Sequence, residues 1–258
     1  MNKFIESRKH NAVLFMREQG MDSALGGVWT NGNTYDHILK IGKGKNQFDV
    51  IKSYNLLKGV EPDMFSDPHR FAHHLTSSQV MCYNFFRPLI GKDRKPSDDL
   101  VTILAENGIV LTEGYDTCAF ETANKQDNTS YDMTIGPVTF EIKFTENGFG
   151  TAKDDDRHKK KFESVYKVML DKCQCLISYP ERKEFLQSYQ LYRNVLHIDN
   201  KSKFAVFVFP KGNVKCMREF AQFHQLISDE YKDNVQAWYW EDLAAGKEDT
   251  DFFKKYLR

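Results

Sequence analysis

Two carboxylates and a lysine are the residues of this chain whose types and spacing could do chemistry. They lie in the stretch 129–146, TSYDMTIGPVTFEIKFTE, which alternates apolar and polar residues on both sides of Gly136–Pro137. Such alternation predicts a β-hairpin, with a two-residue loop as the simplest connection. With Gly136–Pro137 as the loop, Asp132 lies directly opposite Glu141, and Lys143 projects on the same side two residues further on.

The two faces of this predicted hairpin differ completely in polarity, because successive side chains of a strand point to opposite faces. The apolar face consists of Tyr131, Met133, Ile135, Val138, Phe140, Ile142 and Phe144. The polar face consists of Ser130, Asp132, Thr134, Thr139, Glu141, Lys143 and Thr145. We therefore expect the apolar face to dock on helices and the polar face to carry a rigid patch of charged groups.

The opposed carboxylates carry an electrostatic cost. Side chains directly across a ladder have Cβ atoms roughly 5 Å apart, so two negative charges there repel each other. Asp132 and Glu141 must then share a proton or hold a cation between them. Mg²⁺ prefers a few carboxylates and several waters, and it can polarise a phosphoryl oxygen and lower the pKa of a bound water. With Lys143 to stabilise negative charge or hold the attacking water, this set suits phosphodiester hydrolysis.

Asp132, followed by Glu141-Ile142-Lys143, resembles the D–(x)n–ExK signature of the PD-(D/E)XK nuclease superfamily, which has the restriction-endonuclease-like fold. More closely, the chain resembles a family of bacterial proteins assigned as restriction endonucleases, over roughly residues 70–200. The matching blocks are HHLTSSQ (73–79), NFFRPL (84–89), FE (120–121), TSYD (129–132), EIKFTE (141–146) and QLYRN (190–194). One departure is that the Pro-Asp of the superfamily motif is Tyr131–Asp132 here.

The resemblance implies roles for individual residues. Asp132 and Glu141 would bind the metal, with the Ile142 carbonyl as a further ligand, and Lys143 would be the catalytic lysine. The supporting polar residues around the site would be Glu121, Glu146 and Gln190. Further candidates for contact with the substrate are Gln79, Glu146, Lys159 and Arg193. The expected cofactor is Mg²⁺, with Mn²⁺ as a substitute.

The function expected from this set is that of a Mg²⁺-dependent endodeoxyribonuclease acting on double-stranded DNA, in restriction or phage defence. The alternative function is that of a non-catalytic nucleic-acid-binding or interaction protein on the same fold. For the hairpin taken alone, the simplest interpretation is a solvated cluster of charged side chains on the surface. Hydrolysis of sugars fits less well, because directly opposed carboxylates are closer than that chemistry uses. Cleavage of both strands by a one-site enzyme makes a homodimer the default assembly.

Composition limits the other classes of function. The 258 residues contain 36 Lys and Arg against 36 Asp and Glu, so the net charge is zero and any DNA contact must come from local patches. Five cysteines without scaffold spacing predict free thiols in a reducing compartment. Without an apolar run of ~20 residues or a signal-peptide core at the N-terminus, we expect no membrane association and a cytoplasmic protein.

Two other groups of potential metal ligands are better explained without a metal. His69, His73 and His74 invite a zinc site, but caps and packing explain them more simply. Cys173 and Cys175 form a CxC sequence within KCQCLISY, which we interpret as a buried strand because the pair lacks usual zinc spacing.

The order of the predicted elements indicates an α/β fold. We expect strands over residues 117–123, 175–179, 203–209 and 235–240 besides the hairpin. We expect helices over residues 2–19, 47–58, 97–107, 159–170, 181–197, 213–228, 241–246 and 251–257, and one from a cap at Thr76 or Ser77 to just before Pro88. Residues 24–36 are predicted to be a loop. This order favours a restriction-endonuclease-like core with a mixed sheet flanked by helices in residues 61–258, preceded by an N-terminal helical region in residues 1–60.

Overall fold

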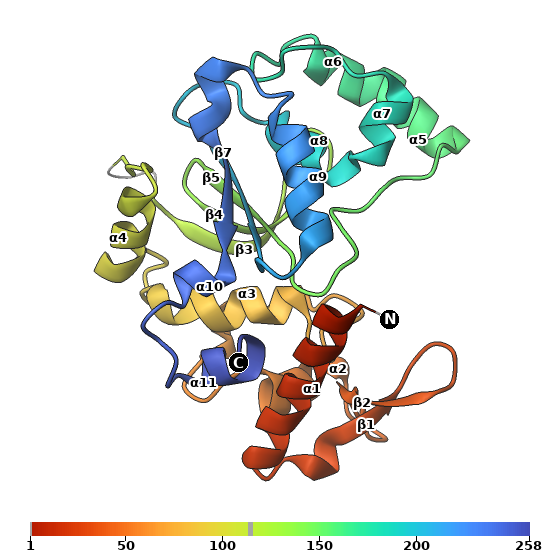
Figure 1. Cartoon of the computed structure of the whole chain (residues 1–258), viewed down its shortest axis with the longest axis vertical. Helices are drawn as coiled ribbons and strands as arrows, with labels where there is room; N and C mark the ends of the chain where they lie inside the picture. Colours follow the sequence, from red (N-terminus) through yellow and green to blue (C-terminus); the bar gives the residue numbers. More distant parts are fainter. Residues whose placement is uncertain (1, 113–115) are drawn as a thin grey trace. The chain divides into compact units, whose positions relative to one another are not determined.

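The computed structural model describes residues 2–112 and 116–258 and divides the chain into two compact units. One, here called the terminal unit, is built from both ends of the chain, residues up to 93 together with 240–258. The other, the central unit, comprises residues 94–239 (Figure 1). The predicted division of the chain at residues 60 and 61 stays a prediction. Among the described residues, none of the helices has both the length and the apolar character needed to cross a bilayer.

The central unit is organised around a five-stranded mixed sheet. Its strands, in the order in which they pair, are β3 (Cys118–Ala123), β4 (Ser130–Ile135), β5 (Val138–Ile142), β6 (Phe204–Phe209) and β7 (Val235–Tyr239). β3, β4 and β5 pair in antiparallel fashion, whereas β5, β6 and β7 run parallel. The predicted α/β fold, an antiparallel hairpin extended by parallel strands, is thereby confirmed.

The hairpin has the predicted register. Ile135 pairs with Val138 and Met133 with Phe140 across the loop, in which Gly136 has a φ of 52°. A positive φ in a two-residue loop matches the twist of the strands, and glycine adopts it without strain. All seven residues of the predicted apolar face are at most 4% exposed. Met133 and Phe140 form the last pair of the ladder, one position before Asp132 and Glu141.

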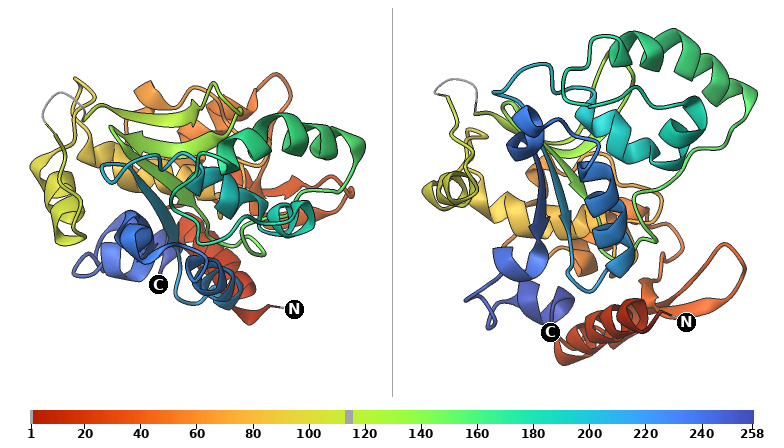
Figure 2. Two further views of the ribbon diagram at one scale, coloured as in Figure 1. Left: turned by 90° about the horizontal axis from the view of Figure 1, so that it is seen from above. Right: turned by 45° about the horizontal axis from the view of Figure 1, so that its top comes forward.

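Helices cover the sheet of the central unit on the side that the polar face of β5 addresses. They are α5 (Asp156–Lys161), α6 (Lys167–Leu170), α7 (Arg182–Gln187), α8 (Tyr189–Val195) and α9 (Val214–His224), whereas α4 (Asp98–Glu106) contributes no residue to the cluster that they form. In the views of Figures 1 and 2, α5 to α8 form one layer and α4 lies away from it. Aromatic residues of this layer share one buried cluster with Phe207 of β6, which is the register partner of Glu141. Glu141 therefore points toward the layer that contains α8.

Most predicted helices of this unit are confirmed, with local differences. Ser97 caps α4 by accepting a hydrogen bond from Leu100 N (3.4 Å). The helix expected over 159–170 begins instead at Asp156, capped by Asp155, and passes through a π-helical turn at Phe162–Tyr166. The helix expected over 181–197 is two helices, broken at Ser188, where φ is −118° and ψ is 41°. A short 3₁₀ helix, Asp229–Asn234, precedes β7.

The prediction of a buried strand over residues 175–179 is wrong. Leu176 makes only an isolated bridge with Ile227, and the side chains of Ile177 and Tyr179 are 61% and 49% exposed. A short apolar run cannot be assigned from periodicity alone. Here the segment crosses the surface beside the end of α9 instead of entering the sheet.

The terminal unit combines helices with a small second sheet. Its elements are α1 (Lys3–Glu18), β1 (Leu25–Val28), β2 (Thr34–Leu39), α2 (Gln47–Val50) with a π-helical turn at Ile51–Asn55, α3 (Ser78–Phe86), α10 (Trp240–Leu243) and α11 (Asp251–Tyr256). Short 3₁₀ helices occupy Asp22–Ala24, Pro62–Met64 and Arg87–Leu89. The predicted Ser77 cap of α3 is confirmed by its hydrogen bond from Val80 N, at 3.4 Å.

The prediction of a loop over residues 24–36 is wrong, because β1 and β2 form an antiparallel pair there. Gly27 explains the error. A Cβ on this residue would lie 2.5 Å from the carbonyl oxygen of Leu39, so the close approach of the two strands requires glycine. Glycine that serves close packing has the same appearance in a sequence as glycine that serves a loop.

A buried polar network holds α11 within the terminal unit. Lys255 Nζ, fully buried, donates to the carbonyl oxygen (2.7 Å) and to Oδ1 (2.8 Å) of Asn55. Asn84 donates to the same carbonyl oxygen (3.0 Å) and to the Tyr256 hydroxyl (2.9 Å), so this buried amide on α3 has its partners. Burial lowers the pKa of Lys255 to about 7.

This lysine predicts a rise in stability with pH. Its folded pKa of about 7 lies below its unfolded value of about 10.4, so between these two values the unfolded chain binds a proton that the folded chain lacks. Stability should therefore increase across that window, by at most about 1.4 kcal/mol per pH unit, and be unaffected by this group below pH 7. Urea unfolding at pH 7.5 and 9.5 should show a smaller increase in Lys255→Met than in the wild type. The neighbouring Lys254→Met is the control, and equal increases in all three proteins would contradict the assignment.

Candidate functional site

The structure brings Asp132, Glu141 and Lys143 together at the open end of the hairpin, where β4 begins and β5 ends. Lys143 Nζ donates to Glu141 Oε1 at 2.5 Å, and the backbone N–H of Ile142 donates to Asp132 Oδ2 at 2.6 Å. Lys143 follows β5 directly, and its own N–H donates to the carbonyl oxygen of Val208 on β6 (2.8 Å). Glu141 and Lys143 are 5% and 7% exposed, so both charges are largely withdrawn from water.

The charges of the three side chains act strongly on one another. Burial and the charge of Glu141 raise the pKa of Asp132 well above its usual value, although Lys143 opposes the shift. Burial alone would lower the pKa of Lys143, but Glu141, Asp132 and Glu146 raise it above its usual value. The lysine is therefore an ammonium, and the two carboxylates share a site in which their negative charges are only partly compensated.

Glu121 and Glu146, both predicted as supporting residues, lie around this trio. Glu121 sits on β3 between the pairs that join Phe120 to Met133 and Thr122 to Tyr131, which places it across from Asp132, and its charge contributes to the raised pKa there. Its φ of 50° is unusual for a residue other than glycine, and such backbone strain concentrates at functional sites.

Glu146 closes the turn that follows Lys143. Its Oε2 accepts a hydrogen bond from Phe144 N at 2.5 Å. Asn213, which caps α9, donates to the carbonyl oxygens of Phe144 (3.2 Å) and Glu146 (3.0 Å). The backbone after the lysine is thus fixed by side chains on both sides.

Asn194 on α8 belongs to the site, although it was not among the predicted site residues. Its Nδ2 donates to Glu141 Oε2 at 3.0 Å and to the carbonyl oxygen of Gln190 at 2.9 Å, and the residue is 2% exposed. Its Oδ1 is buried and accepts no hydrogen bond from any residue that the structure describes. The sequence feature that could have indicated Asn194 as a site residue is its position four residues after the predicted site residue Gln190, because this spacing puts both on one face of a helix.

Gln190 itself packs against the loop that follows the site. A Cβ on Gly150, which has a φ of 77°, would lie 2.9 Å from Gln190 Oε1. The loop can approach α8 this closely only because residue 150 is glycine.

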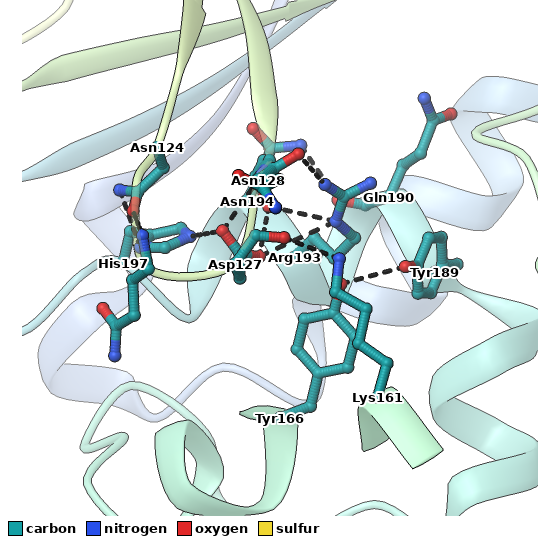
Figure 3. Close-up of polar contacts among 12 residues, drawn as sticks. Asn124, Asp127, Asn128, Lys161, Tyr166, Tyr189, Gln190, Arg193, Asn194 and His197 are labelled. Atoms are coloured by element: carbon teal, nitrogen blue, oxygen red, sulfur yellow. Dashed lines mark hydrogen bonds and ion pairs between the residues drawn. The ribbon is translucent and has the colours of Figure 1, made fainter. Parts of the chain in front are cut away.

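Arg193, predicted to contact substrate, is engaged within the chain (Figure 3). Its Nε donates to Thr129 Oγ1 (3.0 Å) and its Nη2 to the carbonyl oxygen of Asn128 (2.9 Å), while Nε lies 3.7 Å from Asp127 Oδ2. These contacts tie α8 to the turn that leads into β4. Arg193 therefore positions the strand that carries Asp132.

Asp127 is the centre of this polar cluster, and its side chain is fully buried. Lys161 Nζ donates to its carbonyl oxygen (2.6 Å), His197 Nε2 lies 3.2 Å from its Oδ1, and Thr129 donates to its carboxylate through both N–H and hydroxyl. Burial would raise the pKa of Asp127, but the contacts with His197 and Thr129 prevail and lower it to about 2. The carboxylate thus stays charged and links α8 to the turn before β4, while the backbone carbonyl of Asp127 is the contact with α5.

The other two residues predicted to contact substrate, Gln79 and Lys159, also have partners within the chain. Gln79 belongs to the terminal unit, where its Oε1 accepts from His69 N (2.7 Å) and its Nε2 donates to the carbonyl oxygen of Asp67 (2.8 Å). Both ends of its amide are therefore occupied by the turn before α3. Lys159 lies on α5, with Nζ 3.9 Å from Asp156 Oδ1.

The donor set at Asp132 and Glu141 fits a divalent cation. The raised pKa of Asp132 reflects negative charge that a cation would compensate. In residues 2–112 and 116–258, no three His, Cys, Asp or Glu side chains are grouped closely enough to form a complete cage. Two carboxylates supplemented by water are typical of Mg²⁺, which seldom occupies an all-protein site. Among the histidines considered for zinc, burial lowers the pKa of His74 to about 3, and its ring lies 4.7 Å from that of Trp29, as packing predicts.

The cluster around Asp127 generates a stability prediction. Asp127→Ala would leave Arg193 without its buried counter-charge, and removing one partner of a buried pair typically costs about 3–5 kcal/mol. Urea denaturation should show a loss of this order. Glu230→Ala is the matched control, because Glu230 pairs with Lys201 at 3.2 Å on the surface and should contribute about 0–1 kcal/mol. A similar small effect from both variants would contradict the structural role of Asp127.

Comparison with known proteins assigns a family to this arrangement. The model of a family described as "Restriction Endonuclease associating with ARP" matches residues 58–257, which include every site residue discussed above. No curated protein and no solved structure was found to match the chain. The match covers more than half of the sequence, and the chain belongs to this family of restriction endonucleases associating with ARP.

Proposed function

We propose that this protein is a divalent-metal-dependent endonuclease of the PD-(D/E)XK type that hydrolyses phosphodiester bonds in DNA, in restriction or phage defence. The observation that carries the proposal is the convergence of Asp132, Glu141 and Lys143 at the end of one hairpin, with Lys143 Nζ 2.5 Å from Glu141. Membership of a restriction endonuclease family supports it. A site that has no catalytic task gains nothing from burying two carboxylates beside each other, since the repulsion costs stability.

Asp132 and Glu141 would hold the ion, with the Ile142 carbonyl as a further ligand, and Mg²⁺ is the proposed cofactor with Mn²⁺ as a substitute. When bound, such an ion polarises a phosphoryl oxygen and lowers the pKa of a bound water. The protein's part is to fix the two carboxylates. Asn194 holds one oxygen of Glu141, and the Ile142 N–H holds one oxygen of Asp132.

Lys143 supplies the positive charge of the reaction. Its acidic neighbours keep it protonated, so its ammonium can donate hydrogen bonds to the phosphoryl oxygens, on which negative charge grows in the transition state. A preorganised charge in a site of low exposure stabilises that state without reorganisation. The proposed supporting residues are Glu121, Glu146 and Gln190. The charge of Glu121 acts on Asp132, Glu146 accepts a hydrogen bond from Phe144 N, and the carbonyl oxygen of Gln190 accepts one from Asn194.

Basic side chains of α5 are the proposed contacts to the DNA backbone. Arg157, Lys159 and Lys160 lie in one short segment, and contacts between basic side chains and phosphates position a protein on a duplex. Arg193 can contact substrate only through the guanidinium N–H groups that do not donate to Thr129 or Asn128. A homodimer for cleavage of both strands and a cytoplasmic location stay predictions.

The central test is DNA cleavage by the purified protein. Plasmid and linear DNA should be cut in the presence of Mg²⁺ or Mn²⁺ and left intact with a chelator. Lys143→Ala should reduce the rate by roughly 10²–10³-fold, the loss typical when one donor to a developing oxyanion is removed. Lys201→Ala, which removes a lysine paired on the surface, should cleave as the wild type does.

Circular dichroism and thermal melting must show that Lys143→Ala remains folded. Absence of cleavage by the wild type on every DNA form, together with salt-dependent binding, would replace this proposal by that of a non-catalytic nucleic-acid-binding protein.

Asn194 generates a second prediction for the same reaction. Asn194→Ala removes the donor that fixes Glu141 Oε2, and losses of outer partners of metal ligands typically cost about 10–100-fold in metal affinity or activity. The Mg²⁺ concentration needed for half-maximal cleavage should rise accordingly. Asn194→Asp should be more severe, because it adds a third negative charge beside Glu141.

Asn200→Ala on the surface is the control for these variants. An unchanged Mg²⁺ dependence in a folded Asn194→Ala would contradict the role of Asn194 in positioning Glu141.

A further inference from the structure

Cys173 and Cys175, which follow α6 in the central unit, place their sulfur atoms 3.1 Å apart. This separation is only about 1 Å longer than a disulfide bond. The other three cysteines, Cys82, Cys118 and Cys216, are all buried, whereas Cys173 is partly exposed. This pair of neighbouring thiols therefore contains the one cysteine of the described residues that is partly exposed.

Hydrogen bonds hold the backbone on both sides of this pair. Cys173 N donates to the carbonyl oxygen of Leu170 (3.1 Å), and Ser228 N donates to that of Cys175 (2.8 Å). Leu176 then forms a bridge with Ile227. Because these contacts fix both Cα positions, the two sulfurs face each other without a search through chain conformations, which raises the effective concentration of one thiol at the other.

The two thiols differ in their chemistry. The hydrogen bond from Cys175 lowers the pKa of Cys173 to about 7, against the effect of burial. The same hydrogen bond, together with burial, raises the pKa of Cys175. Cys175 is 0% exposed, and its sulfur also lies 3.4 Å from the carbonyl oxygen of Val195. The reactive thiolate is thus the accessible sulfur, and the buried one is placed to attack it next.

We propose that Cys173 and Cys175 form a reversible dithiol–disulfide site that is oxidised by low-molecular-weight disulfides such as oxidised glutathione. The Cys173 thiolate attacks one sulfur of the small disulfide, forms a mixed disulfide and releases the first thiolate. Cys175 then loses its proton to that thiolate and attacks the Cys173 sulfur, which expels the second small thiolate. In sum, the two cysteines are oxidised by two electrons and one disulfide is reduced to two thiols.

This site does not depend on the proposed nuclease activity, and its test reads thiols directly. The native protein is incubated with oxidised glutathione and quenched with acid, and its remaining thiols are alkylated after denaturation and mapped by mass spectrometry. The wild type should lose two thiols, with residues 173 and 175 joined in one chain, and excess dithiothreitol should restore both. Cys216→Ser is the matched control and should form the same disulfide.

Single variants separate the two roles. Cys175→Ser should stop at a stable mixed disulfide between glutathione and Cys173, whereas Cys173→Ser should leave the buried Cys175 unmodified. Cys175→Ala serves in place of Cys175→Ser if circular dichroism shows that the latter is unfolded. The proposal is overturned if the wild type keeps five alkylatable thiols, if it accumulates the mixed disulfide, or if the bond joins other cysteines.

Discussion

Two carboxylates that repel each other at the end of a hairpin are the constraint on which the central unit depends. Neighbouring groups of the chain compensate part of their charge, because Glu141 is largely withdrawn from water. Lys143 neutralises Glu141, and a backbone N–H serves Asp132. Asn194 satisfies the second oxygen of Glu141, which requires α8 to lie over the strand. The position of a whole helix is thus linked to one carboxylate.

Local signals in the sequence were sufficient for the framework of the site. Period-two alternation gave the register that pairs Ile135 with Val138, and a serine before an apolar helix marked the start of α4. Contacts between distant residues left no such mark. The bond between Asn194 and Glu141 spans 53 residues, and the segment 175–179 has the apolar character of a strand but makes only an isolated bridge. Hydrophobic periodicity predicts which face of a helix or strand is buried, but it does not predict which other element packs against that face.

Polar residues that seem available in a sequence are often occupied in the fold. Arg193 and Gln79 were both expected to reach the substrate, and within the chain both form hydrogen bonds with neighbouring turns. A buried carbonyl or N–H without a partner is costly, so the nearest long polar side chain is commonly used for it. Binding residues can be separated from such braces only when the partners are known.

The division of the terminal unit between both ends of the chain sets an order for folding during synthesis. Arg8 of α1 donates to the carbonyl oxygens of Tyr256 and Arg258 (3.3 and 3.1 Å), and the network of Asn55 is completed by Lys255. All strands of the central sheet, including those with the carboxylate pair, have been synthesised by residue 239. The partner of α1, in contrast, is synthesised almost 250 residues after α1 itself. At ~5–20 residues per second, α1 spends more than ten seconds without that partner, with the side chains that it later buries still uncovered.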